Sequence, residues 1–180
     1  MYNFTNKIIN DFREYRTKKL SSFAKLLLKL KISANVMTTL SLLFGLISIY
    51  FLFQNHILFI LFAILHLLAD IFDGVLARSS KSTNFGKYYD YSVDQIITIL
   101  LIIKIGFFLN EYYAYITAFV YLLTNLIYTL KKSQVPILFA RTFTMITLFF
   151  NLPTLAFLTA GVISVYSLAL QLQYFMAKKN

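Results

Sequence analysis

Long apolar stretches, broken by short polar turns, occupy most of this 180-residue chain. Each stretch comes close to the ~20 residues that an α-helix needs to cross the hydrocarbon core of a bilayer. The pattern predicts spans near residues 34–53, 57–78, 87–108, 112–130, 136–151 and 154–176. We therefore expect an all-α integral membrane protein with six transmembrane helices.

The first 33 residues follow a different pattern. Apolar residues such as Ile8, Phe12 and Phe23 recur at roughly helical spacing, with Lys and Arg residues between them. This predicts one or two basic amphipathic helices that lie in the membrane interface. Charges interrupt the apolar residues too often for a signal peptide. We expect residues 1–33 to be a juxtamembrane segment that anchors the chain or attracts anionic lipid, and residues 34–180 to form one six-helix domain.

Charge is distributed unevenly along the chain. It has 17 Lys and Arg residues against 7 Asp and Glu residues, yet the turns at 54–56, 110–111 and 151–152 contain neither Lys nor Arg. The positive-inside rule then places both termini on the cytoplasmic side of the cell membrane and requires an even number of spans. Nucleic-acid binding is disfavoured, because no basic stripe with interleaved aromatic residues lies away from the membrane edge. The absence of cysteine excludes disulfides and thiol chemistry.

Four of the seven acidic residues fall within residues 70–94, inside apolar sequence. A charged side chain at the bilayer centre costs at least ~2.5 kcal/mol, so such residues mark functional sites. Asp70 and Asp73 share one face at the end of the second predicted span, and Asp90 and Asp94 share one face at the start of the third. Carboxylates without His or Cys favour Mg²⁺ or Mn²⁺ over zinc. Two such ions can clamp a phosphoryl group during its displacement.

Small and basic residues accompany these carboxylates. Gly74 and Ala77 leave room for a nucleotide or a backbone to approach, and Arg78 offers the planar cation that suits a diphosphate. Each has a structural alternative: small residues also pack transmembrane helices, and an arginine at a span end also obeys the positive-inside rule. His66, alone on its span, is expected to be a hydrogen-bonded packing residue.

The motif Asp-x2-Asp-Gly-x2-Ala-Arg-x7-Gly-x3-Asp-x3-Asp at residues 70–94 resembles the signature of the CDP-alcohol phosphotransferases, also called CDP-alcohol phosphatidyltransferases. All of its fixed positions match, although the link between Arg78 and Gly86 is one residue shorter than in many members. Residues 33–38 are similar to the Pro-Asn-x-x-Thr that often begins the first span, with Ala34 in place of proline. Six spans, a basic N-terminal helix and a cytoplasmic active-site face also agree with that family.

The resemblance implies a reaction and assigns roles. Such enzymes transfer a phosphatidyl-type group from a CDP-lipid to an alcohol in phospholipid biosynthesis and release CMP. It implies that Asp70, Asp73, Asp90 and Asp94 hold two divalent ions, with Asp94 also placed to deprotonate the acceptor; whether Asp94 is ligand, base or both stays open. The implied nucleotide and diphosphate contacts are Gly74, Ala77, Arg78, Thr83, Gly86, Asn35 and Thr38. A homodimer is implied as well, through the third and fourth spans, whose tyrosines alternatively form an interfacial belt.

The acceptor alcohol is less well defined. Arg141 lies several residues into the fifth predicted span. Its position resembles the one from which family members that use inositol phosphate hold a phosphate. Lys131 either assists it or is a positive-inside flank. The segments that we associate with phosphatidylserine and phosphatidylglycerophosphate synthases are missing. A polyol or a polyol phosphate, such as inositol phosphate or glycerol 3-phosphate, is therefore expected.

Two other classes of membrane protein also place carboxylates in spans. A magnesium-dependent membrane prenyltransferase normally has two separated Asp-rich motifs and more spans than this chain holds. An ion-coupled transporter favours sites at the midplane, where internal repeats meet, whereas these aspartates gather at one membrane edge. Release of CMP, of pyrophosphate or of neither distinguishes the three classes.

Overall fold

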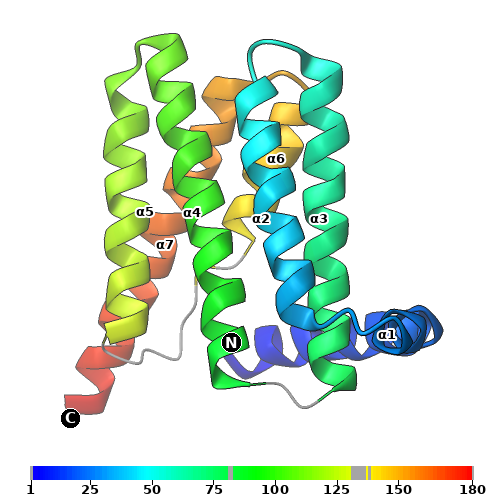
Figure 1. Ribbon diagram of the computed structural model, residues 1–180. Helices are drawn as coiled ribbons and strands as arrows, with labels where there is room; N and C mark the ends of the chain where they lie inside the picture. The colour runs from blue at the N-terminus through cyan, green and yellow to red at the C-terminus, as the bar shows by residue number, and fades with distance from the viewer. Residues whose placement is uncertain (1, 81–82, 131–136, 138, 180) are drawn as a thin grey trace. The chain divides into compact units, whose positions relative to one another are not determined.

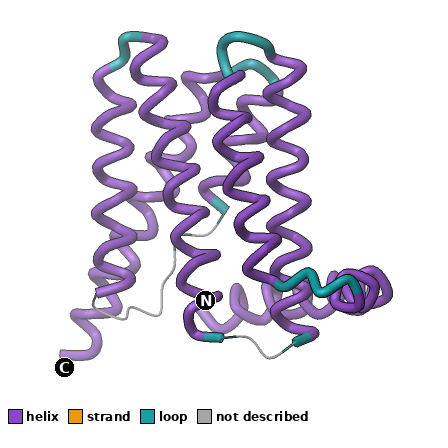
Figure 2. Tube along the Cα trace, viewed as in Figure 1, coloured by secondary structure: helices purple, strands orange, loops and turns teal. Residues whose placement is uncertain are grey.

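A computed structural model of the chain describes residues 2–80, 83–130, 137 and 139–179. The described residues form α-helices joined by short turns and contain no strand (Figure 2). The helices, labelled in Figure 1, are α1 (Tyr2–Lys29), α2 (Ala34–Phe51), α3 (His56–Ser79), α4 (Asn84–Leu109), α5 (Tyr112–Leu130), α6 (Ala140–Phe149) and α7 (Pro153–Lys179). The all-α fold expected from the apolar pattern is confirmed.

Five of these helices, α2, α3, α4, α5 and α7, are long and apolar enough to cross a membrane. Their bounds agree closely with the predicted spans. Helix α6 covers 10 residues of the span expected at 136–151 and begins after Phe139, which has a left-handed backbone with φ 60° and no side-chain cap. Residues 131–136 and 138 lie outside the described part of the chain, and residues 140–149 of the expected span are seen as a helix.

Three helices end in the same way. Lys31, Asn110 and Asn151 have positive φ values, of 60°, 53° and 56°. In each case the next residue donates its backbone N–H to the carbonyl five residues earlier, as Glu111 does to Gly106 at 3.0 Å. This is the Schellman motif, in which a left-handed residue satisfies the last carbonyls of a helix. Asparagine tolerates that conformation, and it therefore ends α4 and α6 sharply.

The chain divides into two compact units, Met1–Gly45 with Ile64–Val93, and Leu46–Ala63 with Asp94–Asn180. In the first unit, α1 runs crosswise to the adjoining ends of α2 and α3 (Figure 1). Ala24 and Leu27 of α1 pack against Val75 and Leu76 of α3 in a buried cluster. The predicted N-terminal helix therefore has one apolar face docked on the end of α3 that carries the aspartates.

Polar groups also join α2 to α3 within the first unit. His66 is fully buried, and its Nδ1 lies 2.9 Å from the Ser41 hydroxyl and 2.8 Å from the Ser41 carbonyl oxygen. The expectation that His66 is a hydrogen-bonded packing residue is confirmed. Buried polar groups of this kind hold helices in register where the surroundings offer no water.

In the second unit, α5 and α6 both pack on α7. Close approach of helices relies on small residues: a Cβ on Gly106 of α4 would lie 3.0 Å from Ala114 Cβ at the start of α5. Lys104 donates to the carbonyl oxygens of Ile49 and Tyr50 in the last turn of α2. A basic side chain at that helix end offsets both the unpaired carbonyls and the helix dipole.

Candidate active site

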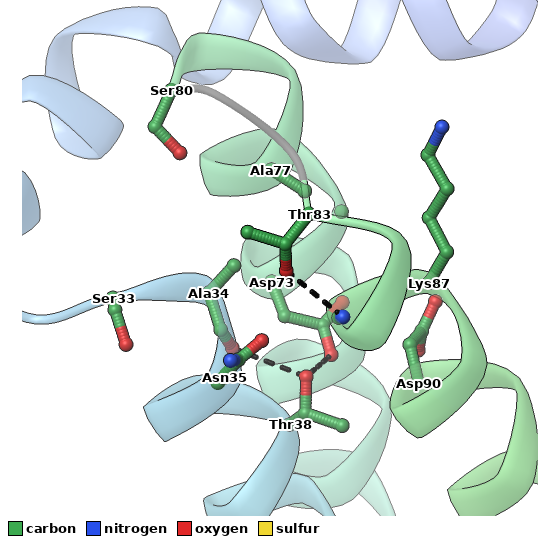
Figure 3. Close-up of a pocket in the computed structure, with 12 residues that line it drawn as sticks. Ser33, Ala34, Asn35, Thr38, Asp73, Ala77, Ser80, Thr83, Lys87 and Asp90 are labelled. Carbon is green, nitrogen blue, oxygen red and sulfur yellow. Dashed lines mark hydrogen bonds between the residues drawn. The ribbon is translucent and has the colours of Figure 1, made fainter.

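A cavity of about 180 Å³ lies in the first unit, where α2 begins, α3 ends and α4 begins (Figure 3). Its walls combine carboxylates, hydroxyls and residues with small side chains. The lining residues are Ser33, Ala34, Asn35, Thr38, Asp73, Gly74, Ala77, Ser80, Thr83, Gly86, Lys87 and Asp90. Every nucleotide contact implied by the sequence motif lies in this set except Arg78. Residues from three parts of the sequence thus meet at one hollow.

Asp73 is the most enclosed carboxylate of the cavity, with 3 % of its surface exposed. The Thr38 hydroxyl lies 2.8 Å from Asp73 Oδ2 and 3.1 Å from the Ala34 carbonyl oxygen, so its proton is directed to one of these two acceptors. Figure 3 shows the Thr38 and Asp73 side chains pointing toward each other. The first turn of α2 therefore orients a carboxylate of α3.

Asp70 and Asp90 approach each other from α3 and α4. Each offers a carboxylate oxygen within 4.8 Å of the other, and both side chains are half-buried. Two carboxylates at this separation can share one divalent cation. Asp94 follows Asp90 by one turn on α4 and therefore lies on the same helix face. Asp73, which Thr38 orients, is more enclosed than Asp70 and Asp90.

The donor set bears on which ion fits. The residues that the structure brings together here offer carboxylate oxygens, and the cavity beside them adds hydroxyl and amide oxygens from Thr38 and Asn35. Hard cations such as Mg²⁺ and Mn²⁺ prefer oxygen ligands of this kind. The residues present therefore fit the divalent ions on which the expected chemistry depends.

Gly86 allows the first turns of α2 and α4 to approach closely. The Gly86 backbone N–H donates to Thr83 Oγ1 at 3.0 Å, which makes Thr83 the N-cap of α4. A Cβ on Gly86 would lie only 2.9 Å from Asn35 Oδ1 and 3.2 Å from Thr83 Oγ1. Only glycine leaves both side chains where they are. The two helix N-termini also bring partial positive charge to this wall, which favours an anionic ligand.

Arg78 lies beside the cavity without lining it. Its Nε donates to Thr17 Oγ1 of α1 at 2.7 Å, and its Nη1 lies 3.4 Å from the point where a Cβ of Gly74 would be. The guanidinium therefore reaches the cavity wall at Gly74. It also ties the juxtamembrane helix to the motif.

In the second unit, Arg141 at the start of α6 forms an ion pair with Asp94. The exposed fractions are 11 % for the Arg141 side chain and 30 % for that of Asp94. Thr98 Oγ1 donates to the Asp94 carbonyl oxygen at 2.8 Å in the next turn of α4. The structure thus brings together the two residues that the sequence linked to the acceptor. Lys131, the other acceptor candidate, lies outside the described residues.

Three residues near the site were not singled out from the sequence. Ser80 and Lys87 line the cavity, and Figure 3 shows Lys87 extending away from Asp73 and Thr38. Arg16 of α1 brings its Nη2 within 3.2 Å of the Cβ position of Gly74. The sequence alone could have indicated Lys87, because it directly follows the motif residue Gly86. Arg16 is one of many basic residues in its segment, and nothing in the local sequence distinguishes it.

Comparison with known protein families adds an independent finding. The sequence model of the CDP-alcohol phosphatidyltransferase family matches residues 31–177. No curated protein gives a significant match to the chain. The matched region includes the whole cavity, both members of the Asp94–Arg141 ion pair and every candidate span. The chain therefore belongs to the CDP-alcohol phosphatidyltransferase family.

Proposed function

We propose that this protein transfers a phosphatidyl-type group from a CDP-linked lipid to a polyol phosphate, with release of CMP. Family membership supports the transfer from a CDP-alcohol. The observation that carries the proposal is the single cavity that unites Asp73 and Asp90 with the small-residue wall at Gly74 and Gly86. Carboxylates on one side and two helix N-termini on the other suit a metal-bound diphosphate.

Asp70, Asp73, Asp90 and Asp94 are the residues that we expect to hold two Mg²⁺ or Mn²⁺ ions. When bound, these ions neutralise charge on the diphosphate and make CMP a better leaving group. The hydrogen bond from Thr38 orients the enclosed Asp73, and α4 places Asp90 and Asp94 one turn apart. Orientation of the carboxylates before substrate enters reduces the reorganisation needed during reaction.

The nucleotide is expected to lie against Asn35, Thr83, Gly86 and Ala77. Asn35 and Thr83 offer an amide and a hydroxyl for polar contacts, and the glycine and alanine leave space for the substrate to approach the backbone. Arg78 adds a fixed positive charge at the neighbouring Gly74, where it suits the diphosphate.

Asp94 is the proposed general base. The acceptor oxygen forms a bond to the lipid-linked phosphorus, the bond from that phosphorus to the CMP oxygen breaks, and the acceptor proton passes to Asp94. The ion pair with Arg141 orients the Asp94 carboxylate. Arg141 is also the proposed ligand of the acceptor phosphate, since it is mostly buried and next to the base.

The surroundings of the site complete the proposal. We place both termini and the active-site face in the cytoplasm, on the basis of the positive-inside pattern. A homodimer is supported by the exposed aromatic residues near the α4–α5 turn, where Phe107, Tyr112 and Tyr113 have exposed fractions of 81 %, 72 % and 68 %. An interfacial aromatic belt would expose the same residues. Cross-linking in liposomes distinguishes a dimer from a belt.

The testing experiment measures CMP release by purified protein in liposomes. It uses a CDP-lipid, Mg²⁺ or Mn²⁺, and an acceptor panel of inositol phosphate, glycerol 3-phosphate, inositol and serine. We expect metal-dependent CMP release with a phosphorylated polyol and almost none from Asp94→Asn, a change that retains size and removes the base. Release of pyrophosphate, or full activity in Asp94→Asn, would contradict the proposal.

A further inference from the structure

Arg16 occupies a defined place because α1 is docked firmly on α3. Besides the buried cluster at Ala24 and Leu27, the rings of Phe23 and Phe72 lie 4.7 Å apart between their centroids. Thr17, the residue after Arg16, accepts the hydrogen bond from Arg78. These contacts hold the middle of α1 against the last turns of α3 and direct the Arg16 side chain to Gly74.

Two guanidinium groups therefore meet at one point. Arg16 Nη2 lies 3.2 Å from the Cβ position of Gly74, and Arg78 Nη1 and Nη2 lie 3.4 Å and 3.6 Å from the same position. The absence of a side chain on Gly74 leaves room for both cations. Two guanidinium groups directed to one point favour an anionic ligand there.

The hydrogen bonding of Arg16 points the same way. Its Nε is buried, yet it makes no hydrogen bond to any residue in the described part of the chain. A buried donor without an acceptor is costly, and native proteins rarely leave one unless a ligand, ion or water supplies the partner. The Arg16 guanidinium is thus held at Gly74, and its Nε lacks a hydrogen-bond acceptor among the described residues.

We propose that Arg16 is a phosphate-binding residue, which joins Arg78 in holding the diphosphate of the CDP-lipid at Gly74. The inference rests on the proposed function and extends its site to α1, because Arg16 lies before residue 31, where the family match begins. The planar fork of an arginine binds two phosphate oxygens at once, and two arginines match the charge of a diphosphate. Gly74 lines the cavity, so a ligand held there is continuous with the carboxylate site.

A second source offers the same chemistry. An anionic phospholipid of the surrounding bilayer also carries a phosphate, and α1 is an interfacial helix. The substrate is favoured, because Gly74 borders the cavity that contains Asp73 and Asp90. The two sources differ in one respect: substrate binding requires no anionic lipid other than the CDP-lipid itself.

The test compares Arg16→Gln with Lys18→Gln, which removes the same charge from an exposed position of α1. In liposomes of zwitterionic lipid, we expect Arg16→Gln to raise the KM for CDP-lipid about tenfold and Lys18→Gln to leave it within twofold, because a charge-assisted hydrogen bond is lost only in the first. Arg16→Lys keeps the positive charge but loses the planar guanidinium. Its KM for CDP-lipid should lie between those of the other two variants, and its melting temperature should be unchanged. This last variant separates binding from docking of α1.

Each outcome decides the question. Equal KM values for Arg16→Gln and Lys18→Gln in an active enzyme would overturn the role of Arg16 and leave the proposed function intact. An effect that appears only when anionic phospholipid is added would assign Arg16 to a bilayer lipid and overturn substrate binding. A wild-type protein without CMP release would count against the proposed function itself, so the two failures are distinguishable.

Discussion

Gly86→Ala tests whether close approach of α2 and α4 forms the nucleotide site. The added methyl would lie 2.9 Å from Asn35 Oδ1 and 3.2 Å from Thr83 Oγ1. The first distance is shorter than a carbon–oxygen contact allows, so the amide of Asn35 must turn away. The second strains the N-cap of α4, and loss of such a cap costs about 1 kcal/mol. Both displaced groups line the cavity.

The effects on stability and on binding are expected to separate. Alanine is about 1 kcal/mol more favourable than glycine within a helix, which offsets the loss of the cap. The net change in the free energy of unfolding should therefore be close to zero. Loss of one hydrogen bond to the nucleotide weakens binding by ~0.5–1.5 kcal/mol, which corresponds to a rise in the KM for CDP-lipid of roughly two- to tenfold.

Gly106→Ala is the matched control. Its added methyl would lie 3.0 Å from Ala114 Cβ and 3.4 Å from the Glu111 carbonyl oxygen, neither of which is the end of a flexible side chain. Overpacking of this kind costs about 1–3 kcal/mol, so the apparent melting temperature should fall while the KM stays unchanged. Thermal melting in detergent and CMP-release kinetics in liposomes measure the two quantities. A wild-type KM in Gly86→Ala, or an equal rise of KM in Gly106→Ala, would refute this account of the site.

Three further predictions concern the carboxylates and the ion pair. Thr38→Val removes the hydrogen bond between Thr38 and the enclosed Asp73 at a cost of about 1–3 kcal/mol. Mg²⁺ titration of CMP release should then show weaker activation, while Thr38→Ser should behave as wild type. Arg141→Gln should reduce CMP release more with a phosphorylated acceptor than with the free polyol. Equal losses with both acceptors would mean that Arg141 acts only through its ion pair with Asp94 and does not bind the acceptor phosphate. Chelation with EDTA should abolish CMP release, and either Mg²⁺ or Mn²⁺ should restore it, whereas residual activity in EDTA would exclude a role for divalent ions at the aspartates.

Much of the fold was predictable, because membrane insertion imposes its own pattern. A span needs apolar residues over its whole length, so the bounds of α2, α3, α4, α5 and α7 follow from hydropathy. The turns at Asn110 and Asn151 lie where polar residues interrupt that pattern. The beginning of α6 was less accessible, because the left-handed backbone of Phe139 that precedes it has no recognisable sequence mark.

Within the site, the spacing of residues on one helix can be predicted from sequence, whereas contacts between helices cannot. The spacing of Asp90 and Asp94 places both on one face of α4, since an α-helix repeats every 3.6 residues. The hydrogen bond from Thr38 to Asp73 joins residues 35 positions apart and depends on how α2 packs against α3. No local periodicity contains that information.

Arg16 shows the same contrast most clearly. The charge pattern of α1 predicts an interfacial helix, but every basic residue on that helix satisfies the pattern equally well. The docking of α1 on α3 brings Arg16 to Gly74. Local sequence therefore determined the helices and the carboxylate-bearing faces, because these depend on hydropathy and on helical repeat. Docking determined which distant side chains complete the site, because that depends on the shapes of the helix surfaces that come into contact.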